Sequence, residues 1–401
     1  MPNSFIIQNK NIVVVGLQAW DEPLGSNCKD IALEFKKYNK VLYVNYPINR
    51  KSLWSKSPND FLKKRFNVLK GKEPEISQID KSFWVLNPKV IMEPSNWLKV
   101  PFLFDWLNKY NNYRFSLRIK AAMSMLKFEN IILFNDQDIY RGFYLKEYLK
   151  PNRFIYYIRD YLLGVDFFKL NGSRLEPKLI KKADLVVCNS VFLQQYAKKY
   201  NNRSYYVGQG CDLTIFNPLI TYNKPESMLE ISGPIIGYVG ALASHRLDIS
   251  LLYALAEKNP KWNLVLVGPE DDVFINSILH QLKNVYFLGN QPIHLLPDFI
   301  SFFNVCINPQ LVNSITIGNY PRKVDEYLAL GKPTVAVDTP TMQIFSEFVY
   351  LAKDQDCFLN EVKKALEESS DLLKKGRIQF ASSHTWENSF YAISDAFSKL
   401  E

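Results

Sequence analysis

Short apolar runs alternate with helical stretches along the chain, and this alternation occurs twice. The first run, residues 11–15, is followed by a glycine, a loop and a helical pattern over residues 29–38. Runs this short, rich in Val, Ile, Leu and Phe, are typical of parallel strands buried on both faces. The same pattern predicts strands at residues 41–44, 83–86, 131–134, 154–157, 185–188 and 205–207, and then at residues 235–239, 262–267, 285–288, 305–307 and 334–337. The sequence therefore predicts two α/β units.

The two halves meet in a stretch without strong periodicity. Residues 216–233 contain Asn-Pro and Lys-Pro steps and end in Ser-Gly before Pro234, which is typical of an interdomain linker. We predict an N-terminal domain over residues 1–217, a C-terminal domain over 218–384, and a final helical segment over 385–401. Two doubly wound domains leave a cleft between them, and ligands in such folds bind beyond the carboxyl ends of the strands.

One predicted helix has the features of a phosphate-binding element. Pro321 opens it, apolar residues follow at helical spacing, and Gly331 ends it. A helix N-terminus carries unpaired N–H groups and a partial positive charge, and Arg322 and Lys323 add two full charges in the first turn. Glu326 lies one turn further on, where its carboxylate could accept hydrogen bonds from two sugar hydroxyls. The alternative is an ordinary capped helix with a solvated glutamate.

Composition places the chain among folded globular proteins. Of its 401 residues, 47% are hydrophobic and 22% charged, which argues against extended disorder. Five scattered cysteines without a CxxC pair favour a reducing cytosol over a disulfide framework or a zinc site. The N-terminus has no signal-peptide pattern, and no run of about eighteen apolar residues occurs, so we expect no membrane-spanning segment.

The charge is divided unevenly between the two halves. Residues 1–218 contain 34 Lys and Arg against 19 Asp and Glu, while residues 219–401 contain 15 against 21. A basic half suggests a partner with an anionic surface: lipid head groups, a phosphorylated carrier or nucleic acid. No recognised nucleic-acid motif accompanies the charge, so nucleic acid is the weaker interpretation.

Aromatic and basic residues are interleaved between residues 97 and 120. The aromatic members are Trp97, Phe102, Phe104, Trp106, Tyr110, Tyr113 and Phe115, and the basic members are Lys99, Lys109, Arg114, Arg118 and Lys120. Such a mixture favours a membrane interface. The alternative is that the aromatic residues form core and the charges a solvated face, because aromatic stripes on helices usually pack inward.

The ordered motifs of the chain resemble those of GT-B glycosyltransferases, specifically the family 4-like bacterial enzymes that build cell-surface polysaccharides. The resemblance covers nearly the whole chain. The motifs that carry it are residues 207–212 with Phe216, Gly237-Tyr-Val-Gly240, Leu266-Val-Gly-Pro269, residues 285–289 with 296–298, and residues 326–333. It implies a GT-B fold: two Rossmann-like doubly wound domains facing a cleft, with the C-terminal helix crossing back onto the N-terminal domain.

The family's donor-site roles transfer to individual positions, with two departures. The resemblance implies that Glu326, five residues before the glycine that ends its helix, binds the ribose of the donor nucleotide. The family's earlier glutamate, which contacts the transferred sugar, is replaced by Gly318. The phosphate loop begins at Gly240 but has Ala241 where the family has arginine.

A phosphate-binding cation is retained elsewhere in that loop. Arg246 occupies the position of the family's lysine, and Lys323 on the Glu326 helix is our candidate for the missing charge. A leaving diphosphate needs such compensation when no metal is bound. We therefore predict a donor site made of Gly240, Arg246, Arg322, Lys323 and Glu326, with no metal and no cofactor, and a UDP-sugar as the expected donor substrate.

Catalysis is harder to interpret from the sequence than donor binding. Asp160 follows the strand at residues 154–157, so its carboxylate is placed where ligands bind in such folds. It is our candidate general base for an inverting reaction, whereas a retaining reaction would depend on donor positioning and the leaving phosphate. A capping or salt-bridge role for Asp160 is the structural alternative.

These observations predict a metal-independent hexosyl- or other glycosyltransferase. It would move a sugar from a nucleotide diphosphate sugar to a lipid-linked or growing polysaccharide acceptor. We expect a cytoplasmic protein, peripherally associated with the inner face of the plasma membrane through its basic N-terminal domain, and without a nucleic-acid partner. The alternatives are a sugar-nucleotide epimerase of the same fold and a degenerate, noncatalytic scaffold.

Overall fold

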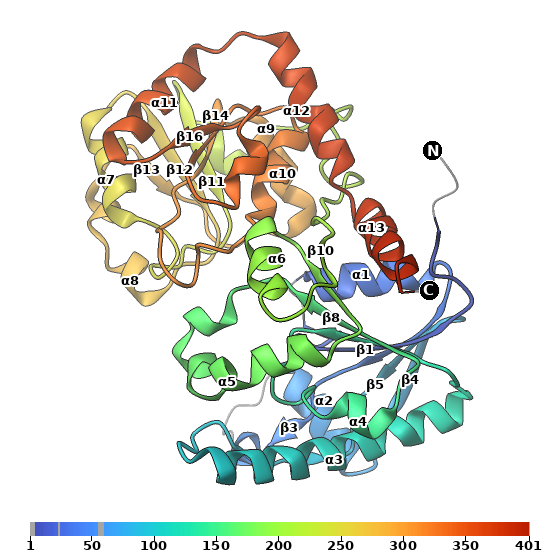
Figure 1. The fold of residues 1–401 in the computed structure, drawn as a ribbon. Helices are drawn as coiled ribbons and strands as arrows, with labels where there is room; N and C mark the ends of the chain where they lie inside the picture. The colour runs from blue at the N-terminus through green and yellow to red at the C-terminus, as the bar shows by residue number, and fades with distance from the viewer. Residues whose placement is uncertain (1–4, 23–24, 55–59, 401) are drawn as a thin grey trace. The chain divides into compact units, whose positions relative to one another are not determined.

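A computed structural model describes residues 5–22, 25–54 and 60–400. The chain forms two compact units (Figure 1). The N-terminal unit comprises Met1–Gly208 with Ser389–Glu401, and the C-terminal unit comprises Gln209–Asn388. Each contains a mainly parallel sheet with helices around it, so the predicted α/β class with two Rossmann-like domains is confirmed.

The sheet of the N-terminal unit has its strands in the order β10-β9-β8-β7-β1-β2-β5-β4. Every pairing in it is parallel except that of β4 with β5. The strands are β1 (Asn11–Gly16), β2 (Lys40–Val44), β4 (Ile76–Asp80), β5 (Phe83–Leu86), β7 (Ile132–Asp136), β8 (Arg153–Ile158), β9 (Leu185–Cys188) and β10 (Ser204–Tyr206). Two short strands, β3 (Ile48–Asn49) and β6 (Ile91–Met92), form a separate parallel pair.

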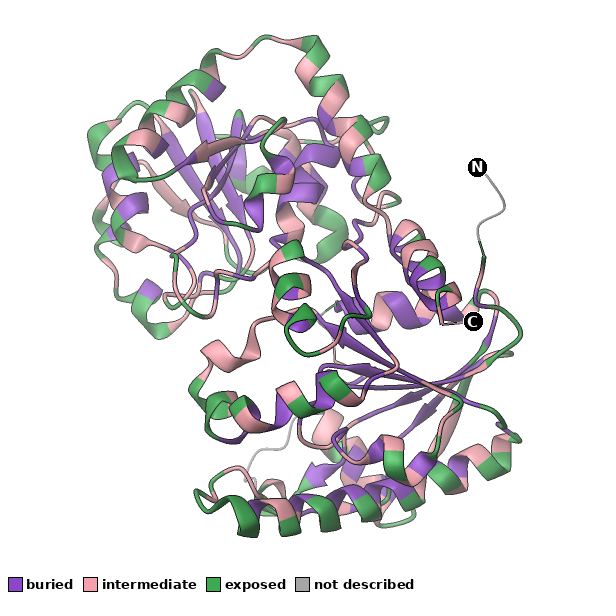
Figure 2. Cartoon of the chain, in the orientation of Figure 1, coloured by how far each residue is buried: buried purple, intermediate pink, exposed green. Residues whose placement is uncertain are grey.

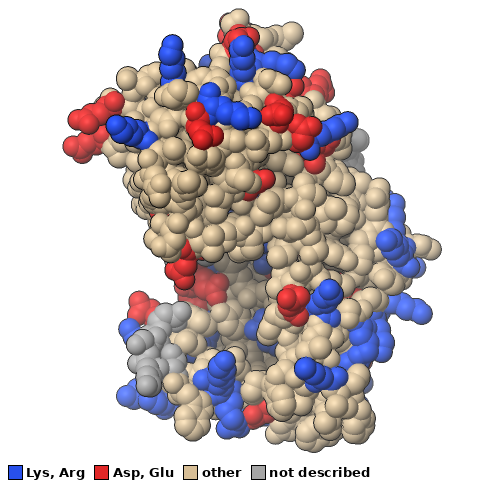
Figure 3. All heavy atoms as spheres, turned by 90° about the vertical axis from the view of Figure 1, so that its left-hand side faces the viewer, with Lys and Arg blue, Asp and Glu red and all other residues tan. Residues whose placement is uncertain are grey.

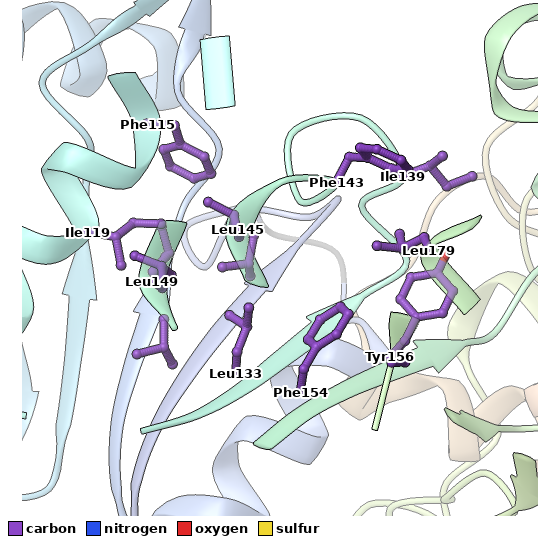
Figure 4. Packing of buried hydrophobic residues seen from close by; sticks show 14 of the residues in the cluster. Phe115, Ile119, Leu133, Ile139, Phe143, Leu145, Leu149, Phe154, Tyr156 and Leu179 are labelled. Atoms are coloured by element: carbon purple, nitrogen blue, oxygen red, sulfur yellow. The ribbon is translucent and has the colours of Figure 1, made fainter. Parts of the chain in front are cut away.

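The helices of the N-terminal unit surround its sheet. They are α1 (Asn27–Lys36), α2 (Asp60–Leu69), α3 (Pro101–Leu126), α4 (Leu145–Leu149), α5 (Asp166–Lys182) and α6 (Val191–Lys198), with 3-10 turns η1 (Arg50–Trp54) and η2 (Leu162–Gly164). Figure 4 shows this core, in which residues of α3 and α4 meet residues of β7 and β8. Burying an aromatic residue such as Phe115 contributes roughly 2 kcal/mol to stability.

The sheet of the C-terminal unit is entirely parallel, in the order β13-β12-β11-β14-β15-β16. Its strands are β11 (Ile235–Val239), β12 (Asn263–Val267), β13 (Val285–Phe287), β14 (Val305–Asn308), β15 (Thr334–Val337) and β16 (Tyr350–Ala352). Its helices include α7 (Ile249–Lys258), α8 (Asp272–Ile275), α9 (Leu296–Ser301), α10 (Arg322–Ala329), α11 (Gln355–Glu367) and α12 (Asp371–Ser383). The last helix, α13 (Trp386–Ser398), contributes its residues from Ser389 onward to the N-terminal unit, where the Phe390 ring lies 5.8 Å from that of Phe35.

All the predicted strands are present, with ends that differ by at most two residues. Most strands of both sheets are buried along their length (Figure 2), as expected for sheets covered on both faces. The sequence analysis missed β4 and the short strands β3, β6 and β16. Strand β4 is half-exposed and polar at the sheet edge, so the apolar-run criterion did not detect it.

Charged side chains of both signs lie on the surface, as the face drawn in Figure 3 shows. Within the described part of the chain, no helix combines the length and the apolar character needed to cross a membrane. Helix α3, the longest in the N-terminal unit, has 26 residues but carries several charges along its length.

Candidate functional site

Helix α10 places several charged side chains at one end of the C-terminal sheet. Pro321 is its N-cap residue, with φ −81° and ψ 90°. Val324, Tyr327 and Leu328 anchor the helix in the core. After the helix, Gly331 adopts φ +70°, the left-handed conformation that glycine takes without strain. These contacts fix the direction in which the charged residues of the first turn project.

Glu326 is buried rather than solvated, so the alternative of a solvated glutamate is wrong. Its residue is 7% exposed, and its Oε1 atom lies 3.1 Å from the Nε atom of Arg322. Burial raises the pKa of Glu326, while the charges of Arg322 and Lys323 oppose that shift. A carboxylate held this way can accept hydrogen bonds from a ligand's hydroxyl groups with little reorganisation.

Lys323 lies against a tyrosine that the sequence analysis did not single out. Its Nζ atom donates a hydrogen bond to the Oη atom of Tyr238 and lies 3.9 Å from the centre of that ring. Burial lowers the pKa of Lys323 to about 7; the Glu326 carboxylate opposes the shift and Arg246 adds to it. In the described residues Lys323 has no ion pair with a carboxylate, so its charge is available to an anion.

Gly240 allows the chain to pass close to this lysine. It follows β11 with φ +135°, a conformation that L-residues rarely adopt. A Cβ atom at this position would lie 2.7 Å from the Nζ atom of Lys323 and 3.2 Å from the Oη atom of Tyr238. Any larger residue would therefore displace the Lys323 side chain, which explains why this position in the motif is glycine.

The loop from Gly240 to Asp248 carries Arg246 and is held by backbone hydrogen bonds on both sides. Leu242 N–H donates to Pro269 (2.8 Å) after β12, and Asp248 N–H donates to Pro309 (3.0 Å) after β14. The Arg246 carbonyl accepts from Leu311 N–H at 2.8 Å. Arg246 makes no ion pair with a carboxylate among the described residues, and its charge affects the pKa values of Tyr238 and Lys323.

The structure therefore brings the predicted donor-site residues together in one unit. Lys323 and Arg246 are cations without carboxylate partners in the described chain, and Glu326 is a buried acceptor one turn along the same helix. A dianionic phosphate group fits the cations, and a pair of hydroxyl groups fits the carboxylate. The two positions that depart from the family pattern, Gly318 and Ala241, have no charged side chain to offer. Gly318 is buried and Ala241 is exposed.

A buried Asp–His pair behind α10 was not predicted. The Oδ1 atom of Asp325 lies 2.8 Å from the Nδ1 atom of His384, and Tyr320 Oη lies 3.3 Å from the same nitrogen. Burial raises the pKa of Asp325, and His384 opposes that shift. The pair joins α10 to the segment before α13. No local pattern could reveal it, because its members are far apart in sequence.

Asp160 lies just after β8 in the N-terminal unit, as expected. Both its backbone groups are fixed by the side chain of Gln137: the N–H donates to Oε1 at 3.1 Å and the carbonyl accepts from Nε2 at 2.6 Å. The described residues show no ion pair for its carboxylate. Its position is therefore set through the backbone, and the side chain is available for another role.

A second carboxylate near Asp160 was missed by the sequence analysis. Asp136 ends β7, is fully buried, and lies 3.1 Å from the Nε atom of Arg159. Burial raises the pKa of Asp136, and the Arg159 charge opposes that shift. The available signal was a polar residue directly after a buried strand, at the sheet end where ligands bind in such folds.

The described residues contain no group of three or more His, Cys, Asp or Glu side chains arranged to hold a metal ion. Positive charge at the site comes from Lys323, Arg246 and the N-terminus of α10.

Comparisons with known proteins agree with this picture. Residues 233–368 match the family model described as glycosyl transferases group 1. The TuaH protein of Bacillus subtilis (strain 168), named as a teichuronic acid biosynthesis glycosyltransferase, is 24% identical over 230 residues. That alignment covers 54% of this chain and 57% of TuaH, so it spans little more than half of the relative.

Solved structures share the fold over almost the entire chain. Sucrose-phosphate synthase from Thermosynechococcus elongatus has a TM-score of 0.68 at 15% identity, covering 98% of this chain and 99% of its own. HepE from Anabaena, solved with UDP and glucose, has a TM-score of 0.65 at 15% identity, covering 98% of this chain and 100% of its own. At these identities the likeness shows the fold, and together with the matched family model it confirms the family 4-like GT-B resemblance.

Proposed function

We propose that this chain, a GT-B protein whose C-terminal unit matches the group 1 glycosyl transferases, transfers a sugar from a nucleotide diphosphate donor. The observation that carries the proposal is the grouping of Lys323, Arg246 and buried Glu326 around the start of α10. This grouping lies within the stretch that matches the family model. The product would be an extended lipid-linked or polysaccharide acceptor.

In the proposed complex, Lys323 and Arg246 bind the donor diphosphate. Gly240 has no side chain, so the Lys323 side chain can lie against its backbone, where a Cβ atom would be 2.7 Å from Nζ. Glu326 accepts hydrogen bonds from the two ribose hydroxyls, and Arg322 holds that carboxylate in position. The contacts with two cations and two hydroxyls would orient the sugar-phosphate bond for reaction.

The same cations would stabilise the leaving group. Breaking the bond between sugar and phosphate leaves an additional negative charge on the nucleoside diphosphate. Fixed positive charges stabilise that developing charge most effectively where water is excluded, and they do so without a bound metal. The burial that lowers the pKa of Lys323 to about 7 indicates such an environment. We therefore propose a metal-independent transfer.

The relatives support a UDP-sugar and a polysaccharide product. HepE was solved with UDP and glucose, and TuaH is named for the biosynthesis of teichuronic acid. We propose that the acceptor is lipid-linked or a growing polysaccharide, and that transfer takes place at the inner face of the plasma membrane. Asp160 remains our proposed general base for the acceptor hydroxyl.

Calorimetric titration with UDP, GDP and dTDP tests the donor site directly. We expect one nucleotide, UDP, to bind, and Glu326→Ala to weaken that binding about 100-fold, because two hydrogen bonds to a charged group are lost. Glu367→Ala, which removes an exposed carboxylate at the end of α11, is the control and should bind UDP normally. Absence of binding by all three nucleotides would remove the donor site and favour a noncatalytic scaffold.

The reaction class needs a second measurement. Mass analysis after incubation with the bound nucleotide's sugar and a lipid-linked acceptor separates three outcomes. Transfer requires the acceptor, epimerisation of the sugar nucleotide proceeds without it, and a scaffold changes neither compound. Only the first outcome is compatible with the proposed transferase.

A further inference from the structure

Helix α3 has an inverted pattern of exposure. Its outward stripe carries aromatic residues: Phe102 is 75% exposed, Trp106 65%, and Tyr110 and Tyr113 are nearly half exposed. Its inward stripe buries Asn108, Asn111, Asn112 and Ser116 beside Phe104 and Phe115. Figure 2 shows buried and exposed residues alternating along this helix. A helix whose outer face met only water would have the opposite arrangement.

The buried amides fix the rotation of the helix. Asn111 exchanges two hydrogen bonds with the backbone of Glu93: its Nδ2 donates to the carbonyl (2.8 Å), and its Oδ1 accepts from the N–H (2.9 Å). Asn112 donates to the Tyr140 carbonyl (2.9 Å) and accepts from Tyr144 N–H (3.0 Å). Turning the aromatic stripe inward would break these bonds and leave buried backbone groups unpaired. The outward aromatic stripe is therefore part of the fold.

Neighbouring segments extend the stripe. Trp97, just before α3, is 69% exposed, and Phe167 in the first turn of α5 is 59% exposed. The Nδ2 atom of Asn171 on α5 donates to the Leu98 carbonyl at 3.2 Å, which places α5 beside the start of α3. We call the set Trp97, Phe102, Trp106, Tyr110, Tyr113 and Phe167 the aromatic face.

The charges on α3 that have no partner of opposite sign in the described chain are positive. Lys99, Lys109 and Lys120 are exposed, and none of them forms an ion pair within the described chain. The single acidic residue of the helix, Asp105, is engaged by Arg174 through two hydrogen bonds of 2.8 and 2.7 Å. A partner of this face therefore meets aromatic rings and free ammonium groups, without a free carboxylate on α3.

We propose that the aromatic face docks the protein on an anionic lipid bilayer. Tryptophan and tyrosine favour the boundary between head groups and acyl chains, phenylalanine and leucine enter the apolar region, and lysines bind anionic head groups. A carbohydrate platform would pair aromatic rings with nearby carboxylates and amides, but here the amides point inward. The proposal rests on the proposed function, because the aromatic face would be the surface through which an enzyme with a lipid-linked acceptor contacts the membrane.

Sedimentation of the full-length protein with vesicles tests the surface. Vesicles of phosphatidylcholine alone are compared with vesicles that also contain phosphatidylglycerol. We expect binding to the anionic vesicles, a loss of at least about tenfold in Phe102→Ser/Trp106→Ser, and a similar loss in Lys109→Gln/Lys120→Gln, since each lysine near such a surface contributes severalfold. Higher salt should weaken the binding of the unmodified protein.

Matched controls lie in the C-terminal unit. Leu219→Ser/Leu372→Ser removes two apolar residues that are 91% and 81% exposed, and Lys261→Gln/Lys283→Gln removes two exposed lysines. Both controls should bind vesicles like the unmodified protein. All altered residues are on the surface, so UDP affinity, measured in parallel, should not change in any variant.

Four results would overturn the proposal. The first is that the aromatic variant binds vesicles as well as the unmodified protein, and the second is that the control variants lose as much binding. The third is a dimer that forms without lipid and that the aromatic variant abolishes. The fourth is an aromatic variant that still binds vesicles but no longer binds soluble polysaccharide. The UDP measurement separates the two hypotheses: vesicle binding without UDP binding would refute the donor site alone, and UDP binding without vesicle binding would refute the docking surface alone.

Discussion

Two helices, α10 in the C-terminal unit and α3 in the N-terminal unit, break the usual rule of burial in opposite ways. Helix α10 buries carboxylates at Asp325 and Glu326, whereas α3 exposes aromatic rings and buries amides. A buried charge is costly unless a partner compensates it, and an exposed aromatic stripe forgoes the free energy of burial.

The two departures indicate two different kinds of binding partner. Around α10, the buried carboxylates have partners in the protein, His384 and Arg322. The nearby cations Lys323 and Arg246, in contrast, have no carboxylate partner in the described chain. This pattern indicates a small, anionic ligand. Along α3 the buried amides of Asn111 and Asn112 are hydrogen-bonded to the backbone of neighbouring segments, and the part without a partner is an extended outer surface. That pattern indicates a large, apolar and anionic partner.

The largest expected effect concerns Asp160 and whether the N-terminal unit contributes chemistry as well as docking. If its carboxylate is the general base, Asp160→Asn should lower the transfer rate by about 10²- to 10⁴-fold with UDP affinity unchanged. Turnover with a lipid-linked acceptor and calorimetry with UDP give the two readouts. Asp166→Asn, an exposed carboxylate of the same unit, is the control. An unchanged turnover would leave Asp160 with a structural role only.

A second, smaller effect follows from the lowered pKa of Lys323. At pH 8 a lysine with a pKa of about 7 is mostly neutral, and a bound diphosphate would favour its charged form. UDP binding at pH 8 should therefore take up close to one proton, and affinity should fall roughly tenfold per pH unit above 7. Calorimetry in buffers of different ionisation enthalpy measures the uptake.

Lys323→Arg provides the matched control, because arginine stays charged throughout this range. It should abolish the proton uptake at pH 8. The lowered pKa of Lys323 also predicts how the free energy of unfolding depends on pH. Between pH 7 and the usual pKa of 10.5, the unfolded chain binds more protons than the folded one. The free energy of unfolding should therefore rise with pH in that range. Uptake that persists in Lys323→Arg would assign the proton to another group.

The fold was largely predictable because parallel strands buried on both faces leave a strong local signal. The run at residues 235–239 became β11 with the same bounds, and Gly331 ended the helix as expected. Strand β4 was not predictable from that signal, because its half-exposed polar sequence is stabilised by pairing with β5. Helix α3 shows the same limit. Its aromatic content was compatible with either a core or an interface, and only tertiary hydrogen bonds fix which rings are buried and which are exposed.

The candidate site was predictable where its residues are adjacent in sequence or in a family motif. Lys323 and Glu326 lie within one turn of α10, and Gly240 and Arg246 lie on one loop. Tyr238 was within the same motif but has no distinguishing local feature; its role follows from its contact with Lys323. His384 pairs with Asp325 across 59 positions, which sequence spacing alone cannot reveal.

Exchanging residues between the two faces of α3 tests whether its inversion is built into the fold. Asn112→Leu puts an apolar residue inside but leaves Tyr144 N–H and the Tyr140 carbonyl without their partners. We expect a loss of about 1–3 kcal/mol in the free energy of unfolding. Leu117→Asn puts a polar residue on the outer stripe, where Leu117 is 44% exposed, and should change stability by less than about 0.5 kcal/mol.

Chemical denaturation of the full-length protein measures both changes. Ordinary amphipathic design would make both substitutions stabilising, because each improves the match between polarity and exposure. A stabilised Asn112→Leu variant would therefore contradict the view that the buried amides hold the aromatic face outward.

The smallest expected effect compares how the two helices end. Both are followed by a residue in the left-handed conformation, Gly331 with φ +70° after α10 and Lys127 with φ +54° after α3. An L-residue in that conformation costs roughly 1 kcal/mol more than glycine. Lys127→Gly should therefore stabilise the protein by up to about 1 kcal/mol. Gly331→Ala should destabilise it by at least as much, because its Cβ atom would also lie 2.7 Å from the Cγ atom of Lys374. Chemical denaturation measures both changes. A destabilised Lys127→Gly variant would show that the lysine side chain itself stabilises the end of α3.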